Sequence, residues 1–226
     1  MLNRFARAIV TRILTPVARA LVALRISPDV VTLVGTLGVV VGALAFYPRG
    51  ELLWGTVVIM AFVLSDTLDG IMARLTGRAS SWGAFLDSTL DRVGDAAVFG
   101  GLVLYYAGEG DDVLMAGLAL ACLVLGQIVS YARARAEGLG MTAAVGIAER
   151  ADRLLVVLVA TGLVGLFGLP SVVLGVVLAL LAVACLVTVL QRMLTVREQV
   201  LRAHQQETDA GRPGSLTGSS SRGTDA

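Results

Sequence analysis

The chain contains six long apolar runs, and this feature constrains its fold more than any other. The runs span residues 30–47, 52–64, 83–106, 113–131, 154–169 and 171–190. A helix needs roughly 20 mostly apolar residues to cross a bilayer. Charged residues make up only 15% of the chain, against about 25% in soluble domains, which excludes an ordinary soluble protein. We predict an all-α integral membrane protein with six transmembrane helices.

Two segments lie outside these runs. In residues 1–26 the arginines fall on one side of a helix and the apolar residues on the other, which predicts an N-terminal interfacial amphipathic helix, kinked near Pro16. A purely structural anchor is the alternative. Residues 204–226 are rich in Gly, Ser and Thr without apolar periodicity, and we predict a disordered polar tail there. The six-helix transmembrane domain then covers residues 27–203.

All 18 positively charged side chains are arginines, and their positions predict the orientation. With a cytoplasmic N-terminus only Arg49 falls on the outer side, so the positive-inside rule places both termini in the cytoplasm. Cys122 and Cys185 lie within apolar runs and lack metal-ligand spacing. We therefore expect small core residues there, and neither a disulfide nor a zinc site.

Aspartates interrupt helices that should otherwise be apolar, namely Asp66, Asp69, Asp87, Asp91 and Asp95. Each costs about 2.5–3.5 kcal/mol at the membrane centre, so they should gather where water or cations compensate them. Asp66 and Asp69 are i, i+3, and Asp87 and Asp91 are i, i+4, so each pair projects from one helical face. The short loop at residues 76–82 predicts antiparallel neighbouring helices, with the pairs facing each other at the cytoplasmic end.

Four converging carboxylates require cations. Oxygen ligands without histidine or cysteine favour Mg²⁺ or Mn²⁺. Two such ions are plausible for four carboxylates, and two-metal sites serve phosphoryl transfer. Arg74 would add a contact to phosphate. The alternative is a structural ion-pair network with Arg74 and Arg92, and Gly70 and Gly83 indicate either close helix packing or the approach of a ligand.

The pattern Asp66-x2-Asp69-Gly70-x2-Ala73-Arg74-x8-Gly83-x3-Asp87-x3-Asp91 resembles the signature of the CDP-alcohol phosphatidyltransferase family at every defined position. Members of that family have an N-terminal interfacial helix, six spans and cytoplasmic termini. The resemblance implies that the four signature aspartates bind two divalent ions and that Asp91 is also the base that activates the acceptor hydroxyl. Asp95 lies outside the signature, and we expect it to pair with an arginine.

The resemblance also implies a donor, CDP-diacylglycerol. The matching positions are Asp29, Val30, Val31, Thr32, Gly70, Arg74 and Ser80. Where the family has Pro-Asn-x-x-Thr, this chain has Asp29, whose carboxylate can only accept a hydrogen bond, for example from the cytosine amino group. For Ser80 the alternative is an N-cap of the following helix.

The acceptor is indicated by segments 130–137 and 149–153, which resemble those of actinobacterial family members that use inositol 1-phosphate (1D-myo-inositol 3-phosphate). There, basic residues hold the phosphate of the acceptor, and arginine suits bidentate phosphate binding. The corresponding arginines are Arg133, Arg135, Arg153 and Arg192. Positive-inside flanking is the alternative explanation for them, and glycerol 3-phosphate, giving phosphatidylglycerophosphate, is the alternative acceptor.

A hypothesis from another class is a small ion transporter whose carboxylates line an ion path. Transporters spread ionisable residues through the bilayer midplane, often in inverted repeats, whereas here they crowd one end of the predicted helices. We therefore favour a phospholipid-biosynthesis enzyme of a bacterial cell membrane. Its partners would be membrane lipid and an inositol phosphate and not nucleic acid, and the glycine-rich spans and the resemblance favour a homodimer.

Overall fold

The computed structural model describes residues 2–63, 65–77 and 80–210, and all regular elements in this part of the chain are helices. The elements are α1 (Leu2–Ala23), α2 (Pro28–Phe46), the 3₁₀ turn η1 (Tyr47–Arg49), α3 (Leu52–Val63), α4 (Ser65–Thr76), α5 (Ser81–Ala107), α6 (Val113–Gly138), α7 (Arg150–Phe167) and α8 (Ser171–Ala210). The predicted all-α class is confirmed.

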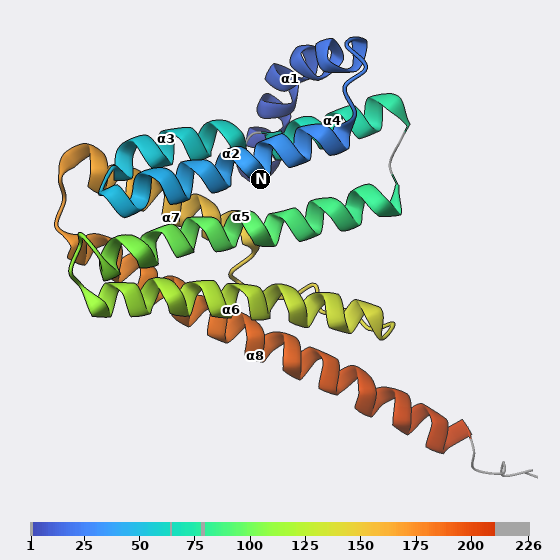
Figure 1. Cartoon of the computed structure of the whole chain (residues 1–226). Coiled ribbons are helices and arrows are strands. Elements are labelled where there is room, and N and C mark those ends of the chain that lie inside the picture. The colour runs from blue at the N-terminus through green and yellow to red at the C-terminus, as the bar shows by residue number, and fades with distance from the viewer. Residues whose placement is uncertain (1, 64, 78–79, 211–226) are drawn as a thin grey trace, which may run out of the picture.

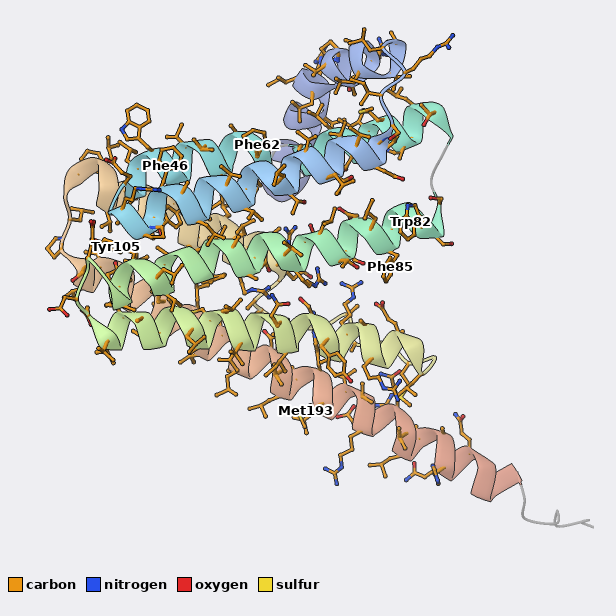
Figure 2. The ribbon with its side chains drawn as sticks, viewed as in Figure 1. Phe46, Phe62, Trp82, Phe85, Tyr105 and Met193 are labelled. Atoms are coloured by element: carbon orange, nitrogen blue, oxygen red, sulfur yellow. The ribbon has the colours of Figure 1, made fainter. Side chains whose placement is uncertain are left out.

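Within the described residues, four stretches are long and apolar enough to cross a membrane, namely Pro28–Arg49, Leu52–Thr76, Val113–Gly138 and Ser171–Gln206. Helices α5 and α7 fall outside this set and carry several charged residues each, in the predicted third and fifth crossings. Large apolar side chains also cover the outside of the bundle: Trp82 and Phe85 are each 60% exposed and Met193 is 61% exposed (Figure 2). Such an apolar exterior suits a lipid environment.

Helix α2 packs against both α4 and α5 and separates them (Figure 1). Glycines on α2 permit this: a Cβ on Gly35 would overlap the Ser65 hydroxyl at the start of α4. Two turns further along α2, a Cβ on Gly101 of α5 would lie 2.8 Å from the Ala43 carbonyl oxygen. Contrary to the prediction from the sequence, helices α4 and α5 therefore do not pack mainly on each other; each packs on α2, and residues of both border one cavity.

The main core lies among α2, α3, α5, α6, α7 and α8, and includes the fully buried Val98, Leu102, Val157, Leu174 and Leu178. Cys122 and Cys185 are free thiols buried in the bundle, as the sequence predicts. Cys122 Sγ lies 3.1 Å from the Leu178 carbonyl oxygen of α8. The core therefore joins these six helices and extends to Val39 and Leu154, close to the aspartates of α5.

Helix α1 packs against α4 through one of its faces. Ala18 packs with Ile71 and Met72 in a separate small cluster. Ile13 and Val17 remain exposed, at 65% and 46%, so α1 has a second apolar face that is uncovered in the isolated chain.

Helix α8 continues to Ala210, so residues 204–210, predicted as the start of a disordered polar tail, are helical. Residues 204–210 include Gln205 and Gln206, which are good helix formers, so the polar composition does not end the helix. Residues 211–226 lie outside the described part of the chain.

The glycine contact between α2 and α5 gives a matched test. Gly101→Ala should destabilise the protein by about 1–3 kcal/mol, because the new methyl group meets the Ala43 carbonyl. Gly100→Ala should stabilise it slightly, since its Cβ would meet nothing within 4 Å and alanine favours helix. Thermal unfolding midpoints in detergent measure both effects. Equal shifts for the two variants would contradict the proposed contact.

Candidate functional site

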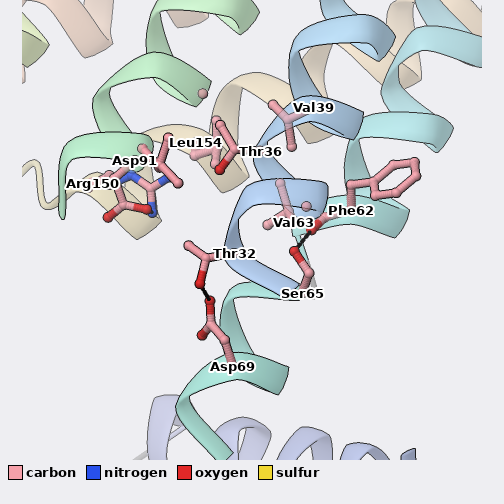
Figure 3. Close-up of a pocket in the computed structure, with 13 residues that line it drawn as sticks. Thr32, Thr36, Val39, Phe62, Val63, Ser65, Asp69, Asp91, Arg150 and Leu154 are labelled. Atoms are coloured by element: carbon pink, nitrogen blue, oxygen red, sulfur yellow. Dashed lines mark hydrogen bonds and ion pairs between the residues drawn. The ribbon is translucent and has the colours of Figure 1, made fainter. Parts of the chain in front are cut away.

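Two cavities meet at Thr32 and Asp69. The larger, about 470 Å³, lies between the start of α2, the second half of α4 and the start of α5. The smaller, about 40 Å³, lies where α2, the end of α3, the start of α4, α5 and the first turns of α7 meet (Figure 3). Thr32 and Asp69 line both cavities, so a change at either residue affects the whole site.

Asp69 is held by a residue of α2. The Thr32 hydroxyl oxygen lies 2.5 Å from Asp69 Oδ2 and 3.1 Å from the Pro28 carbonyl oxygen, so the hydroxyl proton goes to the nearer carboxylate (Figure 3). Asp69 is only 8% exposed. A buried carboxylate needs such a donor, and Thr32 therefore orients the side chain of Asp69.

The remaining signature aspartates are divided between the cavities. Asp87 lines the larger one and Asp91 the smaller one. Asp66 lies one turn before Asp69 on α4, but its side chain is outside the described residues. Among the described side chains, no three His, Cys, Asp or Glu residues are grouped to hold a metal ion.

Asp91 is turned towards arginines. Its Oδ1 lies 2.9 Å from Arg150 Nη1, and its Oδ2 lies 3.5 Å from Arg92 Nη1. The ion pair with Arg92 is one that the structural alternative predicts, whereas Arg150 was not among the predicted site residues. Arg150 is the first residue of α7, one turn before Arg153, and this spacing was the signal that sequence reasoning missed.

The expected pairing of Asp95 with an arginine is confirmed, and Asp95 pairs with two arginines. Asp95 Oδ1 lies 3.1 Å from Arg150 Nε, and Asp95 Oδ2 lies 3.1 Å from Arg153 Nη2. Arg153 is 2% exposed, and Gly126 of α6 leaves room for its guanidinium group. Asp91, Arg150, Asp95 and Arg153 thus form one continuous chain of ion pairs.

The side-chain groups that could ligate a metal ion in both cavities carry oxygen atoms. Carboxylates, hydroxyls and backbone groups line them together with Arg150, and neither histidine nor cysteine is among the described lining residues. Such a set fits a hard divalent cation such as Mg²⁺ or Mn²⁺ and does not fit zinc or copper.

Four of the predicted donor-binding residues line the larger cavity, namely Asp29, Thr32, Gly70 and Ser80. Val30 and Val31 do not: Val30 is 48% exposed, and Val31 packs against the cluster between α1 and α4. Arg74 is exposed on α4 and is not among the residues that line this cavity.

The sequence leaves two interpretations open for each of Gly70, Gly83 and Ser80, namely helix packing or capping, or the binding of a ligand. A Cβ on Gly70 would meet nothing within 4 Å, so this glycine borders open space and not a packed helix. A Cβ on Gly83 would lie 3.4 Å from Ser80 Oγ, an ordinary contact. Ser80 Oγ accepts a hydrogen bond from Gly83 N at 3.0 Å, so Ser80 is the N-cap of α5 and also lines the cavity.

The four predicted acceptor arginines differ in their surroundings. Arg133 and Arg135 are exposed near the end of α6, where Arg133 pairs with Glu137 at 2.8 Å. Arg192 is 4% exposed and donates to the carbonyl oxygens of Val129 and Val145. Arg153 bonds to Asp95 and to the Ala148 carbonyl oxygen, so the two buried arginines are engaged within the protein.

Helix α8 holds the loop that precedes α7. Thr188 Oγ1 accepts hydrogen bonds from the backbone N–H groups of Ile147 and Ala148, at 3.2 and 3.1 Å. Further along, Gln199 binds both backbone groups of Thr142. Together with Arg192, these contacts fix the loop at residues 139–149 and hence the position at which Arg150 begins α7.

Thr188→Val should loosen this loop. The change leaves the two N–H groups without their acceptor, and one of them belongs to the buried Ala148, so about 1–3 kcal/mol of stability should be lost. Amide hydrogen exchange at residues 142–148 should accelerate. Thr195→Val is the control, because the Thr195 hydroxyl bonds within α8 to the Gln191 carbonyl. Unchanged exchange in Thr188→Val would contradict the assignment.

Comparison with known proteins gives consistent matches. The family model of the CDP-alcohol phosphatidyltransferases matches residues 25–147. A phosphatidylinositol phosphate synthase of Streptomyces avermitilis is 55% identical over 208 residues, covering 90% of this chain and 85% of that protein. One from Cutibacterium acnes is 50% identical over 203 residues, covering 87% of this chain and 98% of that protein.

Solved structures match as well. The crystal structure of Mycobacterium tuberculosis phosphatidylinositol phosphate synthase with CDP-DAG bound has a TM-score of 0.79 and 44% identity, covering 82% of this chain and 94% of that chain. The same protein in complex with manganese and citrate has a TM-score of 0.75 and 43% identity, covering 81% of this chain and 88% of that chain.

Proposed function

Because this chain belongs to the CDP-alcohol phosphatidyltransferase family, we propose that it transfers the phosphatidyl group from CDP-diacylglycerol to inositol 1-phosphate (1D-myo-inositol 3-phosphate). The products are phosphatidylinositol phosphate and CMP. The observation that carries this proposal is the larger cavity, which the family signature lines with oxygen donors at one end of apolar helices.

The nucleotide and the pyrophosphate of the donor would occupy the larger cavity. Gly70 leaves open space for phosphate oxygens, and Asp29 is placed to accept a hydrogen bond from the cytosine amino group. Ser80 and Thr32 border the same space, and Arg74 would reach a phosphate from the exposed side of α4. The acyl chains would remain in lipid beside the apolar exterior of the bundle.

The aspartates Asp66, Asp69, Asp87 and Asp91 would hold divalent cations, either Mg²⁺ or Mn²⁺, in a site for two ions. The oxygen donor set around Asp69 and Asp87 supports a hard metal. The cations would neutralise the pyrophosphate oxygens and stabilise the departing CMP. Thr32 contributes by fixing the direction of Asp69.

Asp91 would act as the general base. It takes the proton of the acceptor hydroxyl, and the hydroxyl oxygen forms a bond to the phosphorus that carries diacylglycerol. The bond from that phosphorus to the bridging oxygen breaks, and the electron pair leaves with CMP. Arg133 and Arg135 would offer exposed donors to the acceptor phosphate, whereas Arg153 and Arg192 would contribute positive charge from their buried positions.

The topology belongs to the same proposal. Helices α3 and α4 would form one crossing, and α5 and α7 would cross as well, because their buried charges Asp95 and Arg153 neutralise each other. That gives six crossings within residues 27–203, with both termini and the site cytoplasmic. The uncovered apolar face of α1, within residues 1–26, suits an interfacial helix, and residues 204–226 would extend into the cytoplasm. A homodimer is part of the proposal.

An acceptor panel with purified protein and CDP-diacylglycerol tests the function. Inositol 1-phosphate should be the best acceptor, free inositol should be poor because it offers the arginines no anion, and excess chelator should stop the reaction until Mg²⁺ or Mn²⁺ is restored. Faster transfer to glycerol 3-phosphate would overturn the acceptor. Full activity in chelator would overturn the metal site, and ion flux in vesicles without any transfer would favour the transporter.

Asp91→Asn should lower the turnover number by about 10²–10⁴-fold, because an amide cannot take the acceptor proton. Binding of CDP-diacylglycerol should remain measurable. Asp152→Asn, at an exposed carboxylate in the first turn of α7, is the matched control and should keep normal turnover. If Asp91→Asn retains more than about a tenth of the normal rate, Asp91 is not the base.

A further inference from the structure

Asp95, which lies outside the family signature, is connected to Asp91 through the side chain of Arg150. Arg150 Nε lies 3.1 Å from Asp95 Oδ1, while Arg150 Nη1 lies 2.9 Å from Asp91 Oδ1. The other oxygen of Asp95 lies 3.1 Å from Arg153 Nη2. Asp95 therefore uses each of its oxygens for a different arginine, and only Arg150 continues to Asp91.

Asp95 is the fixed end of this connection. It is 4% exposed, its partner Arg153 is 2% exposed, and Arg153 Nη1 also donates to the Ala148 carbonyl oxygen at 3.2 Å. The side chain of Arg150 is 25% exposed, so it has more room to move. A free arginine side chain has many rotamers, and the bond from Nε to Asp95 limits them.

Because of the shape of its guanidinium group, an Arg150 side chain held by Asp95 also orients Asp91. Its donors form a planar, rigid fork, so fixing Nε also fixes the direction of Nη1. Asp91 and Asp95 lie four residues apart on α5, where two negative charges repel each other. Arg150 lies between the two carboxylates and offsets this repulsion. The orientation of Asp91 therefore depends on a residue that does not line either cavity.

We propose that Asp95 is a positioning residue for the transfer reaction, which acts through Arg150 to hold the Asp91 carboxylate in the orientation that accepts the proton. This inference rests on the proposed function. Arg153 anchors Asp95, and the contact of α8 with the loop before α7 sets where Arg150 starts.

A double-mutant cycle tests the proposal, starting from measured transfer by the unmodified protein. Asp95→Asn keeps the side-chain shape and removes the charge, and Arg150→Gln removes the connection. Each should lower kcat by about tenfold or more, since small displacements of a reacting group cost up to about 10²-fold. The KM for CDP-diacylglycerol should stay within about twofold of normal, and the double variant should be no slower than the slower single variant.

Two further variants separate positioning from charge and from general damage. Arg150→Lys keeps the positive charge but lacks the fork, so its kcat should remain low. Asp152→Asn, the exposed neighbour on α7, should keep normal kcat. Thermal unfolding midpoints and binding of CDP-diacylglycerol are measured for every variant. A fall in kcat with donor binding retained supports positioning, whereas parallel loss of binding, stability and kcat contradicts it.

Several outcomes would overturn the proposal. One is a double variant whose loss equals the product of the two single losses, because Asp95 would then act independently of Arg150. Another is an Arg150→Gln protein with kcat within about twofold of normal. If Asp95→Asn does not fold because Arg153 loses its charged partner, the two Arg150 variants decide, since they leave that buried pair intact. An unmodified protein without transfer to any acceptor overturns the proposed function itself.

Discussion

Burying charge in an apolar helical bundle is the constraint on which the rest of this structure depends. Asp95 and Arg153 are each less than 5% exposed, and such groups are tolerated only as a bonded pair. Their ion pair ties the middle of α5 to the first turn of α7. Arg150 pairs with the other oxygen of Asp95 and also with the Asp91 carboxylate. One internal pair thus positions the side chain for which we propose the chemistry.

A second determinant is how closely helices approach α2. Gly35 on α2 and Gly101 on α5 remove side chains at these contacts, so α2 lies between α4 and α5. The signature aspartates therefore do not simply face each other across one helix pair. Asp69 of α4 and Asp87 of α5 line a cavity that Thr32 and Asp29 of α2 also line, which brings oxygen atoms from three helices to one space.

The location of this cavity agrees with the chemistry of the family. It lies at one end of apolar helices, so a lipid donor can present its phosphates to oxygen ligands while its tails stay in the bilayer. Two of the arginines assigned to the acceptor are buried and bonded within the protein. In the proposed function their charge would support an anion-binding region, and Arg133 and Arg135 would supply the exposed donors.

The sequence by itself determined the helical class and the identity of the signature aspartates, because apolar composition and helical spacing are local properties of the chain. It also predicted that Asp95 pairs with an arginine, since a charge there needs compensation. It did not predict Arg150, the separation of α4 from α5, or the loop contacts of Thr188. Those depend on contacts between residues far apart in the chain. Only tertiary packing decided which cation meets which carboxylate, because several arginines of equal charge compete for each aspartate and geometry alone selects among them.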